Sequence, residues 1–159
     1  MNQRIESLTA RLQKGLAKTQ QILFPLSPAQ WQSAIYEEPC RWSMRDLLAH
    51  FVSAEERLLQ LAKQVAAGGA GVSLDFNFDA YNQEEQKRLA DFSPEELMPM
   101  LSTARQATLQ WIQSLDEAQL QRSGRHPALG DVDLETMITA IYGHQLLHMR
   151  EVMAKLRLA

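Results

Sequence analysis

Four segments of this sequence carry apolar residues at alternating steps of three and four, which limits the folds that the chain can adopt. In the segment after Ser43 these positions are Leu47, Phe51, Ala54, Leu58, Leu61 and Val65. Such steps place the side chains on one narrow face of an α-helix. Similar patterns start near Ile5, Leu97 and Leu134. Because no segment alternates as a strand does, the sequence predicts an all-α fold, an antiparallel four-helix bundle.

Capping signals give the starts of the predicted helices. Ser43, Ser93 and Asp133 are predicted N-caps of the second, third and fourth long helices, and each serine is followed three residues later by an acidic residue that completes a capping box. The segment Val72–Phe92 is the predicted long crossover between the second and third helices, with a helical piece at Tyr81–Leu89. Shorter elements are also predicted: helical turns after Ser27 and Asp116, and loops at 31–41 and 125–131.

The length predicts one domain, residues 1–159, and the charge and apolar pattern exclude some partners. The formal net charge is −3, so no basic field points to nucleic acid or to an anionic membrane. No apolar run reaches the roughly 18 residues of a membrane span, and the first residues lack the apolar core of a signal peptide. The single cysteine, Cys40, excludes an intramolecular disulfide and suits the cytoplasm. A reactive role for Cys40 has little support, because Arg41 is its only basic neighbour in the sequence.

Two of the four histidines, His144 and His148, lie one turn apart on the last predicted helix. They continue the apolar face that includes Met137, Ile141 and Val152, so both rings are expected to point inward, where their nitrogens need partners. If the second and fourth helices face each other, His50 joins them. Three histidines could hold a metal ion with an open position. They could equally be interior histidines that bond to carboxylates or water, and the spacing leaves both interpretations open.

Three stretches together resemble one family. They are Trp42–His50 (WSMRDLLAH), His126–Leu134 (HPALGDVDL) and His144–His148 (HQLLH), which follow the W-[ST]-x-x-(D/E)-x-x-x-H, HP-x-L-G and H-x-x-x-H patterns of DinB-like, YfiT-related proteins. The resemblance covers nearly the full length. It implies a four-helix bundle with a long crossover between helices two and three, and it implies that His50, His144 and His148 are metal ligands.

The resemblance also implies a range of functions. Nickel or zinc is the expected ion, with manganese or iron as alternatives, and histidine ligation suits nickel and zinc alike. The family implies a metal-dependent enzyme acting on a small molecule, either a hydrolase that activates water or a transferase that activates a low-molecular-weight thiol. A homodimer is expected. Two non-catalytic alternatives are a stress-induced or damage-inducible metal-binding protein that sequesters small molecules, and a plain helical interaction module.

Other residues near these motifs are weaker candidates. Glu55 and Glu151 could orient imidazoles or act as bases, although a solvated helix face explains them as well. Tyr142 and Arg105 could reach a substrate pocket at one end of the bundle. Two further positions complete the expectations: His126 is expected to be a loop residue outside the ligand set, and Gln145 stands where many family members carry Asp and cannot act as a base.

Overall fold

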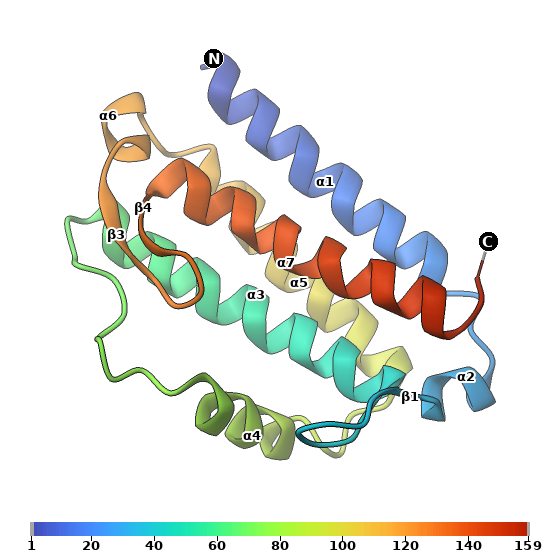
Figure 1. Cartoon of the computed structure of the whole chain (residues 1–159). Coiled ribbons are helices and arrows are strands. Elements are labelled where there is room, and N and C mark those ends of the chain that lie inside the picture. Colours follow the sequence, from blue (N-terminus) through green and yellow to red (C-terminus); the bar gives the residue numbers. More distant parts are fainter. Residues whose placement is uncertain (1, 159) are drawn as a thin grey trace.

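A computed structural model describes residues 2–158 of the protein. Four long helices dominate the architecture: α1 (Gln3–Leu23), α3 (Met44–Ala66), α5 (Pro94–Ile112) and α7 (Leu134–Lys155). Shorter elements occupy the connections: helices α2 (Pro28–Gln32), α4 (Phe78–Arg88) and α6 (Glu117–Leu120), and strands β1 (Ala34–Tyr36), β2 (Trp42–Ser43), β3 (Ser123–His126) and β4 (Gly130–Asp133). The predicted helical bundle is confirmed (Figure 1).

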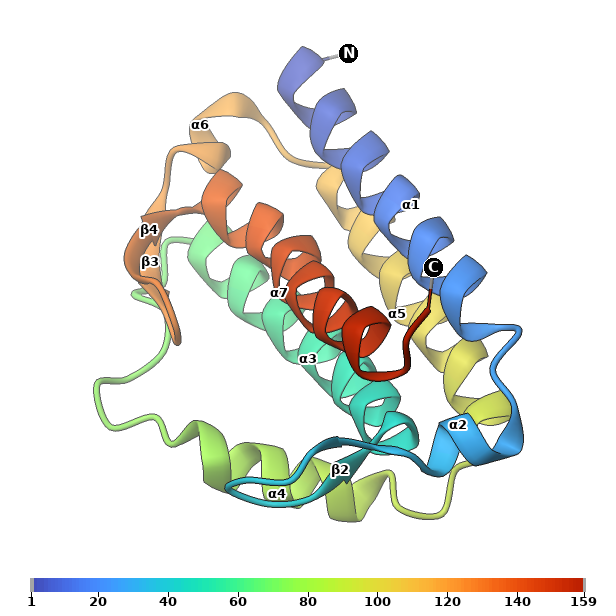
Figure 2. The same ribbon diagram turned by 45° about the vertical axis from the view of Figure 1, so that its right-hand side comes forward.

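The long helices pack so that each contacts two of the others. Helix α3 contacts α5 and α7, and α1 contacts the same two helices (Figure 2). Near the end of α3, the carbonyl of Ala66 accepts a hydrogen bond from Arg122, which follows α5 and α6, so α3 and α5 run in the same direction. Arg4, at the start of α1, bonds to Glu135, at the start of α7, so these two helices also run in the same direction. Helices α3 and α7 are antiparallel neighbours.

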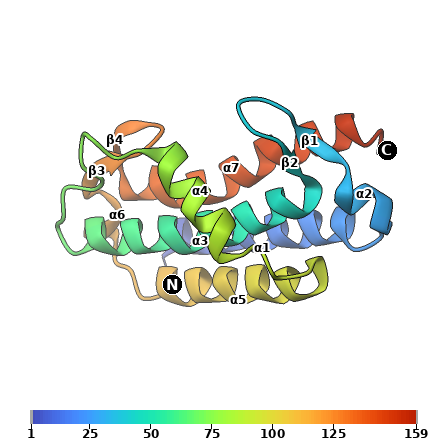
Figure 3. The ribbon, with the colours of Figure 1, turned by 90° about the horizontal axis from the view of Figure 1, so that it is seen from below.

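The predicted crossover between the second and third long helices is confirmed, and it is what allows α3 and α5 to run parallel. Helix α4 lies in this crossover and packs across α3 (Figure 3). Gln86 donates to the carbonyl of Asp46 at 2.8 Å, and Arg88 lies 2.7 Å from Glu56. These contacts attach the crossover to the outer face of α3.

The helices start at the predicted caps. The Ser43 side chain accepts from the Asp46 amide while the Asp46 carboxylate accepts from the Ser43 amide, and Ser93 and Glu96 form the same reciprocal pair. Asp133 caps α7 by accepting from the Thr136 amide at 2.8 Å. Each cap bonds amides that have no partner within the helix, and so fixes the residue at which α3, α5 and α7 begin.

The core consists of two apolar clusters along the bundle. The first includes Met44, Leu47, Phe51, Leu97, Leu101 and Val152, and the second includes Leu8, Leu12, Val65, Ile112, Leu134 and Ile141. Four of the buried polar side chains hydrogen-bond to one another between the helices: Glu55, Arg105, Thr108 and Gln145. The middle of the bundle is therefore partly polar.

Both predicted loops contain short hairpins, which is a correction to the sequence interpretation. Strands β1 and β2 pair antiparallel, and β3 pairs with β4 in continuous register from Ser123 opposite Asp133 to His126 opposite Gly130. Strands of two to four residues are too short for a detectable alternation. The second hairpin also pairs with the crossover at Gly71, where φ is +90° and a Cβ would collide with the Arg125 backbone.

Between residues 2 and 158, none of the helices combines the length and the apolar character that a bilayer-spanning segment requires.

Candidate metal centre

Helices α3 and α7 bring His50, His144 and His148 together. The Nε2 atom of His144 lies 3.0 Å from Nε2 of His50 and 3.1 Å from Nε2 of His148. One ring nitrogen from each of the three side chains falls within 4.8 Å of the other two. The ring centroids are 4.7–5.5 Å apart and the ring planes meet at steep angles, so the rings are not stacked face to face.

The placement of this group follows from the helix starts and from the bundle topology. His50 lies seven residues after the Ser43 cap, and His144 and His148 lie 11 and 15 residues after the Asp133 cap. The four-residue separation puts the latter two on one face of α7, one turn apart. Because α3 and α7 are packed against each other, that face meets His50.

Burial keeps the three imidazoles in the neutral form at neutral pH. Burial and the neighbouring histidines lower the pKa of His50 to about 3, and burial and the neighbouring His148 and His126 lower the pKa of His144 to about 4. Burial also lowers the pKa of His148, although Glu151 opposes that shift. A neutral imidazole has one unprotonated nitrogen, which is the form that binds a metal ion.

The donor set fits a divalent transition metal. Three imidazole nitrogens converge, and imidazole is a ligand that zinc and nickel accept readily. Two short Nε2–Nε2 contacts at one atom of His144 also need an explanation, because that atom can carry at most one hydrogen and can donate to only one neighbour. A shared positive ion satisfies all three nitrogens at once.

The first hairpin forms a wall beside the histidines. The Trp42 ring packs on His50 with centroids 4.9 Å apart, and Tyr36 contacts His148 with centroids 5.7 Å apart. The Tyr36 hydroxyl lies 2.6 Å from Nδ1 of His148 and donates a hydrogen bond to Glu151. Burial and the bond to Glu151 raise the pKa of Tyr36, so its hydroxyl keeps its proton.

Sequence reasoning missed Tyr36, and it used Trp42 only as the first residue of the family motif. Tyr36 lies in a segment predicted as loop, and its contact with His148 spans 112 residues of chain. No local pattern signals such a contact. For Trp42 a signal existed, since it opens the same motif that ends in His50.

A second polar group lies in the bundle interior. Arg105 is fully buried, and its guanidinium donates to both carboxylate oxygens of Glu55 at 2.7 and 2.8 Å. It also donates to the carbonyl of Leu12 and to the amide oxygen of Gln145. The Thr108 hydroxyl donates to the Glu55 carboxylate at 2.9 Å. Both carboxylate oxygens are thereby occupied.

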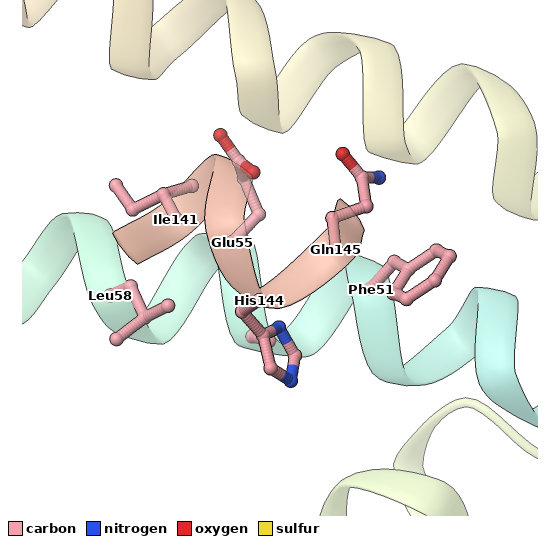
Figure 4. Close-up of a pocket in the computed structure, with 7 residues that line it drawn as sticks. Phe51, Glu55, Leu58, Ile141, His144 and Gln145 are labelled. Carbon is pink, nitrogen blue, oxygen red and sulfur yellow. The ribbon is translucent and has the colours of Figure 1, made fainter. Parts of the chain in front are cut away.

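This second group corrects two expectations. Glu55 was a candidate base or orienting group, but its carboxylate bonds to Arg105 and Thr108, and Figure 4 shows it pointing away from the His144 ring. The crevice that both residues line is too narrow for a water molecule. Arg105 lies in the middle of the bundle rather than at a pocket at its end.

The remaining candidates fall outside the histidine group or at its edge. Tyr142 packs its ring over Gly15 of α1, in contact with the second apolar cluster. Glu151 is exposed, accepts a hydrogen bond from Tyr36 and lies 3.9 Å from Nδ1 of His148, on the side of that ring away from His144. Cys40 is exposed in the turn of the first hairpin.

His126 is buried in the second hairpin and does not belong to the converging group. Its Nδ1 accepts hydrogen bonds from the amides of Ala128 and Leu129 at 3.1 and 3.2 Å, so Nε2 carries the hydrogen. Within the described part of the chain, that Nε2 atom has no hydrogen-bond partner. The ring closes the turn that starts at Pro127.

The fold and the site together define a class of protein. Its members are helical bundles with a crossover after the second long helix and with three histidines between the second and fourth long helices. The sequence matches the DinB superfamily over residues 11–152, which is most of the chain. The protein therefore belongs to the DinB superfamily. All three histidines and Tyr36 fall within the matched range.

Solved structures with similar folds include YfiT from Bacillus subtilis, described as a probable metal-dependent hydrolase with an unusual four-helix bundle topology. It is 15% identical, has a TM-score of 0.74, and the match covers 100% of this chain and 91% of YfiT. An uncharacterised protein from Escherichia coli UTI89 is 16% identical, with a TM-score of 0.71 and coverage of 100% and 98%.

A mycothiol-dependent maleylpyruvate isomerase also shares the fold. It is 16% identical with a TM-score of 0.73, and the match covers 96% of this chain but 63% of the isomerase. This chain thus corresponds to about two thirds of that enzyme's length. No curated protein matches the sequence. At these identities the likenesses show the fold.

Proposed function

We propose that this protein is a metal-dependent enzyme whose divalent ion is held by the Nε2 atoms of His50, His144 and His148. The observation that carries the proposal is the convergence of one ring nitrogen from each of three histidines, all within 4.8 Å of one another, on two separately capped helices. A metal ion bound there supplies a Lewis acid that can activate water or a thiol. Nickel and zinc are the proposed ions, because histidine nitrogens suit both.

Hydrolysis of a small molecule is the proposed reaction. YfiT, described as a probable metal-dependent hydrolase, matches this chain over nearly all of both proteins, whereas the thiol-dependent isomerase is matched over 63% of its length. The chain's own residues have three tasks. The histidines hold the ion, Trp42 and Tyr36 form one wall beside it, and the Glu55–Arg105 pair fixes α3 against α5 behind it.

Thiol transfer is the alternative reaction. The isomerase is described as mycothiol-dependent, and its fold matches 96% of this chain. The two reactions differ in their second reactant, because hydrolysis uses water and thiol transfer needs an added thiol. We propose a small-molecule substrate and the cytoplasm as the compartment. We also propose a homodimer, and light scattering of the purified protein will test that assembly.

The test has two stages. Chelator-treated protein is titrated calorimetrically with Ni²⁺, Zn²⁺ and Mn²⁺, and one site per chain is expected, with His144→Ala and His148→Ala each losing tight binding. His126→Ala is the matched control, because it removes a buried histidine outside the group. Absence of binding by the unmodified protein for all three ions contradicts the proposal.

The second stage separates the reactions. The metal-loaded protein is assayed against a panel of small amides, esters and phosphoesters, with and without an added low-molecular-weight thiol. Turnover that needs the metal and no thiol supports hydrolysis. Turnover that appears only with the thiol supports transfer. A loaded protein that turns over nothing in either condition supports a binding role.

A further inference from the structure

We propose that Tyr36 and Glu151 fix the tautomer of His148, so that its Nε2 is unprotonated before any metal arrives. Tyr36 is thus a positioning residue on the first hairpin, and Glu151 is the acceptor that orients it. The value of this arrangement for metal binding rests on the proposed function, but the tautomer itself is a property of the metal-free protein. It can therefore be measured separately.

The contacts form a chain from the surface to the histidine group. Glu151 is exposed and accepts a hydrogen bond from the Tyr36 hydroxyl. The same hydroxyl oxygen lies 2.6 Å from Nδ1 of His148, while the Glu151 carboxylate is 3.9 Å from that nitrogen. The carboxylate is thus too far to bond the ring directly. Tyr36 stands between them, and the opposite nitrogen of the ring, Nε2, faces His144 at 3.1 Å.

Counting hydrogens fixes the direction of these bonds. A phenol has one hydrogen, and a carboxylate oxygen accepts but does not donate. The Tyr36 hydrogen therefore goes to Glu151, which leaves an oxygen lone pair facing His148. The Nδ1 atom of His148 must then be the donor. In a neutral imidazole with a hydrogen on Nδ1, the lone pair lies on Nε2, the nitrogen that faces the other histidines.

The local fold positions the tyrosine for this contact. In the first hairpin Tyr36 pairs with Trp42, and their rings meet edge to face with centroids 6.4 Å apart. Trp42 packs in turn on His50. Glu151 lies three residues after His148 on α7, so both hydrogen-bonding partners of Tyr36 are on one helix face. The hydroxyl is thereby held between two groups whose spacing the helix sets.

A comparison with His50 shows what the Tyr36 hydroxyl contributes to His148. Its Nδ1 is buried and, among residues 2–158, has no hydrogen-bond partner. Trp42 packs against the ring but offers no bond to that atom. In His148, by contrast, the contact with Tyr36 determines which ring nitrogen is unprotonated. Residues that hydrogen-bond to the second nitrogen of a metal-binding histidine typically contribute about 10–100-fold in metal affinity.

The experiment is long-range ¹H–¹⁵N correlation spectroscopy of metal-free, ¹⁵N-histidine-labelled protein at neutral pH, which distinguishes the two neutral tautomers by their nitrogen shifts. The expected result is a hydrogen on Nδ1 of His148 and none on Nε2. A hydrogen on Nε2 of His148 in the unmodified protein overturns the inference, whether or not the protein binds metal.

Two variants test the direction of the chain. In Glu151→Ala the hydroxyl loses its acceptor and turns to donate to Nδ1, so His148 is expected to switch to the Nε2–H tautomer. Tyr36→Phe removes the bond and is expected to give a mixture, and the double variant should match Tyr36→Phe. Tyr81→Phe, on α4 beside Arg57, is the matched control and should leave the His148 signal unchanged. A Glu151→Ala spectrum identical to that of the unmodified protein overturns the inference.

Metal titration of the same variants separates this inference from the proposed function. Both Glu151→Ala and Tyr36→Phe should bind Ni²⁺ or Zn²⁺ about 10–100-fold more weakly than the unmodified protein. If the tautomer is as expected and the unmodified protein binds no metal, the proposed function fails while the tautomer assignment stands. If metal binds and neither variant weakens it, the role of Tyr36 and Glu151 as positioning residues is overturned.

Discussion

Two polar groups lie inside this bundle, and they differ in how their atoms are satisfied. The histidine group joins His50 of α3 to His144 and His148 of α7, and the second group joins Glu55 of α3 to Gln145 of α7 through Arg105. In the second group every contact pairs a donor with an acceptor. In the first group three chemically identical nitrogens face one another.

The difference separates a structural role from a binding role. A buried ion pair with saturated hydrogen bonds needs nothing from outside, and removing one partner leaves a charge stranded. Neutral imidazoles that converge on one another gain little from the fold itself, whereas an added cation satisfies them together. The same two helices therefore carry a bonded scaffold and, beside it, the proposed site for an external ion.

The largest expected effect comes from breaking the ion pair. Arg105→Met leaves Glu55 buried without its partner and should lower the free energy of unfolding by about 3–5 kcal/mol. Urea unfolding of the metal-free protein measures it. The metal affinity of the folded fraction should stay unchanged. A loss below about 1 kcal/mol would show that the pair is not a scaffold.

Breaking the histidine group should have the opposite result, with a large loss of metal affinity and a small change in stability. In His144→Ala metal affinity should fall by more than about 100-fold, beyond the usual effect of losing a group behind a ligand. The stability of the metal-free variant should change by no more than about 1 kcal/mol, because the ring has few favourable partners to lose. Calorimetry and urea unfolding report the two quantities. A large loss of stability with retained metal binding contradicts the assignment.

Replacing both partners of the ion pair sharpens the comparison. In the double variant Glu55→Leu, Arg105→Met, no charge is left stranded, so it should be more stable than Arg105→Met alone by about 2 kcal/mol or more. The comparison needs only urea unfolding of the two variants. Equal stability would mean that Arg105 acts through its other bonds, to Leu12 and Gln145, and not through Glu55.

Among the histidine variants, the smallest effect on metal affinity is expected at His126. Its Nδ1 accepts two amide hydrogen bonds in the second hairpin, so His126→Ala should cost about 1–2 kcal/mol of stability. Metal affinity should stay within about twofold of the unmodified protein. A large loss of metal binding in this variant would bring His126 into the site.

The sequence predicted most of the fold because its signals are local. Capping boxes at Ser43 and Ser93 and the repeating apolar steps depend on residues within a few turns, and the helices start where those signals stand. The histidine spacing on α7 is local too. The contact of His50 with that pair came from reasoning about the bundle, and the family motif pointed to the same residues.

What the sequence did not reveal depends on contacts between distant segments. The pairing of Tyr36 with His148 and of Glu55 with Arg105 spans 112 and 50 residues. Glu55 illustrates the problem, because it lies five residues after His50, about 140° around α3, and this spacing alone does not say which neighbouring helix the carboxylate faces. Only the packing of α5 shows that it faces Arg105. Short hairpins escape for the same reason, since their strands are defined by each other.

The central claim is that the three histidines bind one divalent ion, and anomalous diffraction from crystals grown with Zn²⁺ or Ni²⁺ tests it most directly. The prediction is a single strong peak about 2.0–2.1 Å from the Nε2 atoms of His50, His144 and His148, with solvent completing the coordination. No peak at the histidines, or a peak bound through other side chains of the protein instead, would contradict the claim.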